Sequence, residues 1–214
     1  KQGLLVDAGD AVGCGNITFR PGGEAVHDLM QTAGYQVGTI GNREFHFSKI
    51  GFHTKLSRAR IPLLCANMRS VAGDTLPVQP SWLVELAGGV RVLFVGLTVP
   101  MITEKMLSRN VSAYVFSDPI RTAEELIPRL REEHKPHLLV ALTHIGLRQD
   151  RLLAERVEGI DLIIGGHSHD TILEGEWVKE TLIVQTGCCA RNYGKVVCDP
   201  ASPRNSLVAS LEGL

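Results

Sequence analysis

Five side chains that can bind metal ions follow apolar runs of strand length in this sequence. Asp10 follows LLVDAG, Asn42 follows VGTIG, His144 ends LLVALTH, and His167 and His169 follow DLIIGG. In an open α/β sheet, ligands bind at the carboxyl ends of the strands, so we expect these groups to meet at one edge of a largely parallel sheet. Each of them alone has a more ordinary explanation as a turn former or a structural residue. Their coincidence at successive strand ends is what indicates a site.

The ligand types indicate which chemistry such a site performs. Oxygen and nitrogen ligands without a thiolate suit Mn, Fe, Co or Zn, and the spacing His167-x-His169 lets two imidazoles of one loop face neighbouring ions. A carboxylate such as that of Asp10 can bridge two ions. Two ions that share a bridge can hold a hydroxide, lower its pKa and clamp phosphoryl oxygens during in-line displacement. The natural reaction class is therefore hydrolysis of a phosphate ester by the bridging hydroxide.

The stretch GNREFH, residues 41–46, follows one of these strands directly. The guanidinium of Arg43 fits phosphate oxygens and the charge that develops in the transition state. The imidazole of His46 titrates near neutral pH and can protonate a leaving oxygen. We therefore predict Asn42 and Arg43 as substrate-binding residues and Arg43 and His46 as catalytic residues. The alternative stays open that Arg43 is solvated or ion-paired and that His46 packs at the surface.

Hydrophobic periodicity predicts the strands and helices that must position these residues. Along most of the chain, apolar runs of strand length alternate with segments of helical spacing. An antiparallel hairpin is predicted around Gly88-Gly89, and Pro128 predicts a kink or break in its helix. The predicted strands are Leu4–Asp7, Gln36–Ile40, Pro62–Ala66, Trp82–Leu86, Arg91–Leu97, His137–Thr143, Asp161–Ile164, Leu182–Gln185, Tyr193–Cys198 and Leu207–Leu211. The predicted helices lie near Glu24–Ala33, after Ser48, after the N-cap Asp118 and around Asp150–Val157. This order predicts an α/β fold in one domain.

Composition limits the kind of partner. The 22 Lys and Arg residues nearly balance the 23 Asp and Glu residues, which argues against binding to nucleic acid, and no apolar run reaches the roughly 18 residues that span a membrane. A small-molecule phosphate ester is the expected partner, and the oligomeric state is left open. The five cysteines are odd in number and lack CxxC spacing, so reduced thiols and a cytoplasmic location are expected; export with a leader upstream of Lys1 is the alternative.

Several motifs together resemble the catalytic domain of calcineurin-like metallophosphoesterases, in the branch of 5′-nucleotidases and UDP-sugar hydrolases. The resemblance covers almost the whole chain and is carried, in order, by LLVDAGD, GYQVGTIGNREF, LLCANM, GVRVLFVGLTVP, LLVALTHIGLRQD, DLIIGGHSHD and LIVQTGCCARNYGKV. It implies a layered αββα sandwich with two mixed β-sheets and two divalent metal ions. It further implies that Asp10 is the bridging ligand, that Asn42, His144 and His167 complete one metal, and that His169 contributes to the other.

Three features depart from that family pattern. The family's Asp-x-His motif would lie before residue 1, so we expect residues 1–214 to be the catalytic domain without its N-terminal strand and that motif. A C-terminal nucleotide-binding domain is not part of the sequence. The branch usually reads GNHEFD where this chain has GNREFH, so Arg43 stands in place of a histidine that acts near the leaving group and His46 in place of its aspartate.

The sequence therefore predicts a metal-dependent phosphoric ester hydrolase of the 5′-nucleotidase type. Its expected substrate is a phosphomonoester or pyrophosphate of a nucleotide or nucleotide sugar. One alternative keeps the fold but makes the enzyme a phosphodiesterase, for example on a cyclic nucleotide. The other is a non-catalytic binding domain, because Arg43 replaces the usual histidine.

Overall fold

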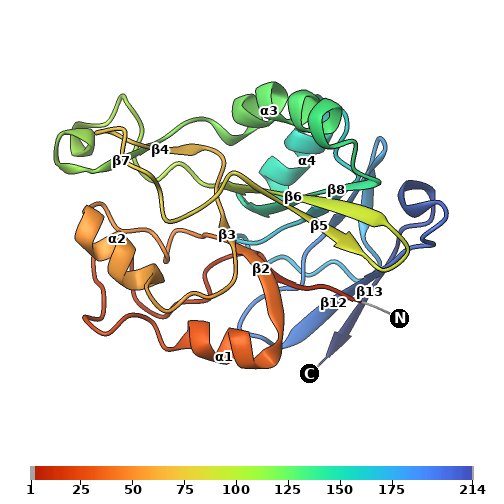
Figure 1. The fold of residues 1–214 in the computed structure, drawn as a ribbon, viewed down its shortest axis with the longest axis horizontal. Helices are drawn as coiled ribbons and strands as arrows, with labels where there is room; N and C mark the ends of the chain where they lie inside the picture. The colour runs from red at the N-terminus through yellow and green to blue at the C-terminus, as the bar shows by residue number, and fades with distance from the viewer. Residues whose placement is uncertain (1–2, 214) are drawn as a thin grey trace.

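The computed structural model describes residues 3–213, and its two largest β-sheets stack face to face (Figure 1). The larger sheet has the spatial order β10 (Glu176–Val178), β11 (Thr181–Val184), β9 (Leu162–Ile164), β8 (Leu138–His144), β6 (Val90–Thr98) and β5 (Ser81–Leu86). The smaller sheet has the order β1 (Leu5–Asp7), β2 (Tyr35–Thr39) and β3 (Leu63–Leu64). The predicted α/β class is confirmed.

Strand direction explains why the strand ends gather. Strands β6, β8, β9 and β11 are parallel, while the edge strands β5 and β10 run antiparallel to their neighbours. The three strands of the smaller sheet are all parallel. The hairpin predicted around Gly88-Gly89 is confirmed as the β5–β6 pair, in which Leu86 faces Val90. Parallel strands deliver their carboxyl ends to one edge, which is where the predicted site residues stand.

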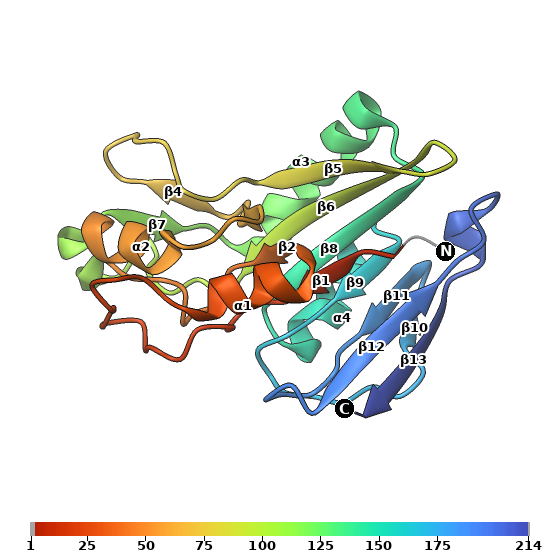
Figure 2. The same ribbon diagram turned by 60° about the horizontal axis from the view of Figure 1, so that its bottom comes forward.

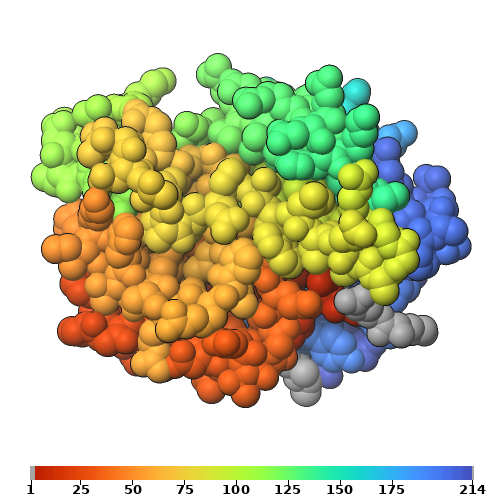
Figure 3. Space-filling model, viewed as in Figure 1, coloured from red at the N-terminus to blue at the C-terminus, as the bar shows by residue number. Residues whose placement is uncertain are grey.

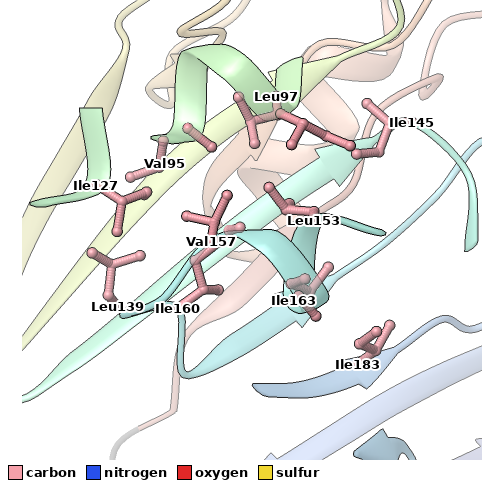
Figure 4. Packing of buried hydrophobic residues seen from close by; sticks show 14 of the residues in the cluster. Val95, Leu97, Ile127, Leu139, Ile145, Leu153, Val157, Ile160, Ile163 and Ile183 are labelled. Carbon is pink, nitrogen blue, oxygen red and sulfur yellow. The ribbon is translucent and has the colours of Figure 1, made fainter. Parts of the chain in front are cut away.

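Both faces of the larger sheet are buried, which explains why its strands read as continuous apolar runs. In β6, Leu93 and Val95 face one side, where they pack with residues of α3 (Pro119–His134) and α4 (Leu147–Arg156). Figure 4 shows this packing, with Ile127 of α3 and Leu153 of α4 lying over the sheet. The alternate residues Val92 and Phe94 face the smaller sheet. Because successive side chains of a strand point to opposite faces, the apolar run of β6 contributes alternate residues to the core on each side of the sheet.

The smaller sheet is covered on its outer side by α1 (Val26–Ala33) and α2 (Lys49–Leu56), which completes the layers α, β, β and α (Figure 2). Ser48 caps α2 by accepting a hydrogen bond from the Gly51 N–H. A third core joins Phe52 of α2 to the strand pair β4 (Met68–Ser70) and β7 (Tyr114–Phe116). Figure 3 shows the lobe of this strand pair standing apart from α3, with a notch between them.

The predicted helices are all present, with differences at their boundaries. Asp118 caps α3 as predicted, its side chain accepting from the Arg121 N–H. The predicted break at Pro128 is absent, because α3 continues through this residue to His134. Since Ile127 and Leu130 on either side of Pro128 are buried in the core, packing offsets the lost backbone hydrogen bond. Helix α4 begins at Leu147, three residues before the predicted start.

The end of the chain forms a separate antiparallel pair, β12 (Asn192–Val197) and β13 (Val208–Gly213). The predicted strands in this part of the chain are confirmed, and the pair lies beside the larger sheet in Figure 2. Val196 and Ala209 pack against the core between the two main sheets. Within residues 3–213, none of the helices has both the length and the apolar character that a membrane span requires.

Candidate active site at the strand ends

Four strand ends meet where the two main sheets come together. Asp10 follows β1 and Asn42 follows β2 of the smaller sheet, whereas His144 ends β8 and His167 follows β9 of the larger sheet. The prediction of a single sheet edge therefore needs a correction, because the site is shared by two sheets. His144 Nδ1 lies 2.7 Å from the carbonyl oxygen of Ala8 and so joins them directly.

The four polar side chains converge at short distances. His144 Nε2 lies 3.4 Å from Asp10 Oδ2, and His167 Nδ1 lies 3.1 Å from Asn42 Oδ1. The rings of His144 and His167 meet edge to face with centroids 5.0 Å apart. The structure thus brings together Asp10, Asn42, His144 and His167 from four separate parts of the sequence.

The backbone at the site has unusual conformations that bring these groups close. Asp10, His167 and His169 have φ values of 62°, 78° and 61°, in the left-handed region that few non-glycine residues adopt. A Cβ on Gly41 would lie 2.2 Å from Asp10 Oδ1, so only glycine permits the approach of the β2 turn to Asp10. Three positive-φ residues at one place are typical of a functional site, since each costs on the order of 1 kcal/mol or more.

Glu44 links the Asp10 loop to the Gly41 turn through hydrogen bonds to both. Its carboxylate accepts three backbone N–H groups, from Asp10 at 2.9 Å, Val12 at 3.1 Å and Gly41 at 2.7 Å. The residue is only 2% exposed, so these bonds replace the water that the carboxylate lost on folding. Sequence reasoning gave Glu44 no role, because its three partners are backbone groups that no motif shows.

Lys55 of α2 also binds the backbone of this turn, through three carbonyl oxygens. Its Nζ donates to the carbonyl oxygens of Gly15 at 2.6 Å, Arg43 at 2.5 Å and Phe45 at 3.2 Å. The side chain is 0% exposed, and burial is the largest cause of its lowered pKa. All three ammonium protons therefore have acceptors, as a buried charge requires. The backbone of GNREFH is held by a buried anion and a buried cation.

Electrostatics couple Asp10 and His144. Burial alone would raise the pKa of Asp10, but His144 and the Arg43 N–H outweigh burial and lower it. Burial alone would likewise lower the pKa of His144, but Asp10 outweighs it and raises the pKa. Burial and the neighbouring His144 lower the pKa of His167. Asp10 is therefore an anion at neutral pH, facing two imidazoles.

Arg43 is ion-paired with Asp10, which is the arrangement that the alternative interpretation expected, and its role in binding phosphate stays a prediction. Its backbone N–H donates to Asp10 Oδ1 at 2.7 Å, and its Nε lies 3.7 Å from Asp10 Oδ2. The side chain is 52% exposed, so its outer nitrogens can still reach a bound anion. The position thus combines an ion pair with an accessible guanidinium.

His46 is not brought to this cluster. Its ring is 4% exposed, stacks on Phe47 at 4.7 Å, meets the edge of Phe19 at 5.2 Å and packs against Gly51. Its Nδ1 accepts from the Ser48 N–H at 3.0 Å, and burial lowers its pKa. This placement does not support the hypothesis that the His46 ring reaches in and protonates a leaving group, nor the alternative of surface packing. The ring is enclosed because Phe47 and α2 fold over it.

His169 stands apart from the four converging residues. It lies two residues after His167 on an exposed loop, close enough for its charge to lower the pKa of His167. In the part of the chain that the structure describes, no hydrogen bond, ion pair or ring contact joins its side chain to Asp10.

A metal ion is the group that this donor set would accept. Within residues 3–213 no three His, Cys, Asp or Glu side chains are already arranged around a common point. The buried His144 Nε2, however, has no hydrogen-bond partner among the described residues and faces the Asp10 carboxylate. An imidazole nitrogen that makes no hydrogen bond and faces a carboxylate, with an amide oxygen and a second imidazole next to it, suits a divalent cation of the Mn, Fe, Co or Zn type.

Two buried acids near the site were missed by sequence reasoning. Asp7 accepts from the Gly9 N–H at 2.9 Å, and burial raises its pKa to about 6. Asp150 accepts from Thr143 Oγ1 at 2.7 Å, and burial raises its pKa to about 7. A Cβ on Gly165 would lie 2.3 Å from Asp150 Oδ2, so this acid supports the turn that leads to His167. The position of Asp150 on a helix gave no sign of this contact.

Comparison with known proteins places the chain in a family, although no family model matches it. It is 30% identical over 181 residues to the 5′-nucleotidase of Rattus norvegicus, which covers 80% of this chain and 30% of that protein. It is 29% identical over 232 residues to the trifunctional nucleotide phosphoesterase protein YfkN of Bacillus subtilis, with 91% of this chain and 15% of that protein covered. The chain thus spans less than a third of the length of these curated relatives.

Solved structures give the same result. The 5′-nucleotidase precursor from Thermus thermophilus matches with a TM-score of 0.75 and 26% identity over 99% of this chain and 45% of that chain. The calcineurin-like phosphoesterase YfkN from Bacillus subtilis matches with a TM-score of 0.74 at 21% identity, over 98% and 76% of the two chains, and shows the same fold. The layered fold is that of a phosphoesterase domain. The chain belongs to the calcineurin-like phosphoesterases, in the branch of the 5′-nucleotidases, which confirms the sequence resemblance.

Proposed function

We propose that residues 1–214 act as the catalytic domain of a metal-dependent phosphoesterase that hydrolyses a phosphomonoester or pyrophosphate of a nucleotide or nucleotide sugar. The observation that carries this proposal is the buried His144 Nε2, which makes no hydrogen bond among the described residues and faces Asp10 Oδ2 at 3.4 Å where four strand ends meet. The names of the relatives, which include 5′-nucleotidases and a nucleotide phosphoesterase, support the substrate class.

In this proposal, Asp10, Asn42, His144 and His167 hold one divalent cation, and Asp10 and His169 contribute to a second. Bound cations would activate water and neutralise the charge on a phosphoryl group. His144 already has the orientation that this requires, because its Nδ1 is directed at the Ala8 carbonyl oxygen and leaves Nε2 for a cation. The Ala8 contact thereby selects the tautomer of the imidazole.

Arg43 would bind the phosphate. A guanidinium offers several N–H donors in a planar fork, which suits the phosphate oxygens and the charge of the transition state. Arginine side chains in general do not serve as proton donors to a leaving group. Because Phe19 and Phe47 enclose the His46 ring, we do not assign it this role, and in the proposal the leaving oxygen takes its proton from water.

A second candidate is a binding domain without catalysis, and one distance favours it. Arg43 Nε lies 3.7 Å from Asp10 Oδ2, where a positive charge opposes the binding of a cation by the same carboxylate. In that case the site would bind a phosphate compound through Arg43 and would not turn it over.

Assays of the full-length protein distinguish these functions. We would measure hydrolysis of AMP, UDP-glucose, 2′,3′-cyclic AMP and bis(4-nitrophenyl) phosphate with added Mn²⁺ or Co²⁺ and with EDTA. The proposal expects metal-dependent release of phosphate from AMP, or of UMP and glucose 1-phosphate from UDP-glucose, with the two diesters slower. Faster hydrolysis of the diesters would favour the phosphodiesterase alternative.

An Arg43→His variant tests the binding-domain candidate directly. If wild type turns over none of these substrates and Arg43→His turns them over with Mn²⁺, the catalytic proposal for the natural chain is wrong and the binding domain is supported. If both hydrolyse the monoester, the enzyme proposal stands. The matched control is Arg69→His, since Arg69 is also an exposed arginine paired with a carboxylate, that of Glu104, but it lies on β4.

A further inference from the structure

Two adjacent cysteines lie on the loop after β11 and have no part in the proposed reaction. Their sulfur atoms are 3.4 Å apart, with Cys189 exposed and Cys188 partly exposed. Both cysteines are free of disulfide bonds, and the Cys189 thiol beside it raises the pKa of Cys188. The two sulfurs are therefore accessible, close together and unmodified.

The loop holds the two thiols in a fixed arrangement. The Gly187 N–H donates to the Asp170 carbonyl oxygen at 2.8 Å, and Asn192 Nδ2 donates to the Thr186 carbonyl oxygen at 3.1 Å. Between these anchors Gly187, Cys189 and Ala190 have φ values of 83°, 61° and 50°. Two consecutive non-glycine residues in the left-handed region turn the chain sharply here. The anchors pre-organise the pair and lower the entropy cost of binding through both sulfurs.

The spacing between the sulfurs favours chelation over a disulfide bond. Two thiolates at about 2.3 Å from a tetrahedral ion stand about 3.8 Å apart, whereas a disulfide requires about 2.0 Å. The observed 3.4 Å differs from the chelate spacing by about 0.4 Å and from the disulfide by about 1.4 Å. Within residues 3–213 no third His, Cys, Asp or Glu completes a group around these thiols. The fitting ligand is a soft centre that needs only two sulfurs from the protein.

We propose that Cys188 and Cys189 form a dithiol site for a soft, thiophilic centre, of which a monosubstituted trivalent arsenical is the matching chemical class. With such an arsenical in its oxide form, two As–S bonds form and the As=O bond breaks. The oxygen leaves as water with both thiol protons, so arsenic stays trivalent and no oxidant is needed. Thiolate sulfur is the soft ligand type that such centres select.

The experiment uses the reduced full-length protein and phenylarsine oxide as the probe. The protein is titrated in the presence of excess 2-mercaptoethanol, and bound arsenic per chain is measured by intact mass. Wild type is expected to retain one equivalent, which a dithiol such as dithiothreitol removes. Cys188→Ser and Cys189→Ser should each weaken retention by at least about 100-fold, because each loses the second, intramolecular bond.

Cys198→Ser is the matched control, since Cys198 is an exposed cysteine on a neighbouring strand end without a thiol partner. It should bind the probe as wild type does, and thermal melting of all three variants would establish that they are folded. Retention by either single variant, or loss of the probe from wild type to the monothiol, would overturn the proposal. So would a wild-type mass two hydrogens lower with no arsenic bound, which would show that the pair forms a disulfide instead.

Discussion

The two sides of the candidate site are built differently. On the side of the smaller sheet, the Asp10 loop and the Gly41 turn rest on Glu44 and Lys55, which are 2% and 0% exposed. On the side of the larger sheet, His144 is buried, but His167, Ser168 and His169 stand on an exposed loop. One side is held by two buried charges, and the other by the Ser168 hydroxyl, which bonds to the Leu147 N–H and Gln185.

This difference indicates which side sets the geometry of the site. A carboxylate that accepts three backbone N–H groups and an ammonium that donates to three carbonyls leave the GNREFH backbone little freedom. Ser168 anchors the backbone of the exposed loop, but the side chains of His167 and His169 stand in solvent, so they can adjust to a ligand at small cost. Substitution of the buried Glu44 or Lys55 should therefore lower the stability of the fold, whereas substitution of an exposed histidine should lower activity alone.

The largest effect is expected at the carboxylate that both sides share. Asp10→Asn keeps the shape but removes the charge that faces His144 and Arg43, and the metal-dependent kcat should fall by about 1,000-fold or more. Steady-state kinetics with Mn²⁺ would measure this. The unfolding free energy should change little, and a variant that keeps wild-type kcat would remove Asp10 from the site.

Glu44→Ala tests the side held by buried charges. It leaves three buried backbone N–H groups without an acceptor, so the free energy of unfolding in urea should fall by about 3–5 kcal/mol. The control is Glu104→Ala, which removes a half-exposed carboxylate paired with Arg69 and Arg109 and should change stability by less than about 1 kcal/mol. Equal losses in both variants would contradict the comparison.

Asp150→Asn tests the buried acid behind the His167 turn. The pKa of Asp150 is about 7 in the folded protein against 3.8 as its ordinary value, so between these values the folded state binds a proton that the unfolded state has lost. This group therefore lowers wild-type stability as pH rises from about 4 to about 7. The variant lacks that loss, and its stability relative to wild type should rise by about 2–3 kcal/mol between pH 5 and pH 8. Urea unfolding at both pH values measures it, and a difference that is flat with pH would exclude the raised pKa.

His169→Ala tests the exposed side. We expect kcat to fall by about 10- to 100-fold while the free energy of unfolding changes by less than about 0.5 kcal/mol. The matched control is His53→Ala, which removes a histidine from the exposed side of α2 and should leave kcat unchanged. A loss of stability as large as that of Glu44→Ala would show that both sides are held alike.

The smallest effect on activity is expected at His46. Burial lowers the pKa of His46, so the folded state holds it neutral while the unfolded state takes up a proton below about pH 6.5. Wild type should therefore lose stability as pH falls through this range, and His46→Asn should lose less. The pH profile of kcat should be the same in both proteins. If the fall of kcat at high pH were present in wild type and absent from His46→Asn, His46 would be the proton donor after all.

Much of the fold follows from the sequence. The alternation of apolar runs and helical segments predicted the α/β class, and the Gly88-Gly89 turn predicted the β5–β6 hairpin. The short strands β4 and β7, which pair with each other, and the strand β10 were not predicted, because three residues are too few to show a periodic pattern. Pro128 was expected to kink or break α3; the helix is not broken there, because Ile127 and Leu130 pack in the core, and the kink stays a prediction.

For the site, the sequence by itself determined which groups stand at strand ends: Asp10, Asn42, His144, His167 and His169 are recognised by their type and spacing. Only the tertiary structure decided that two sheets share the site, that Glu44 and Lys55 hold its backbone, and that the His46 ring is buried against Phe19 and Phe47. The physical reason is that a strand pattern is local and shows only where a residue lies along one strand. Which residues meet is decided by the face-to-face packing of the sheets and by the partners of buried backbone donors. Both depend on residues that are distant in the sequence.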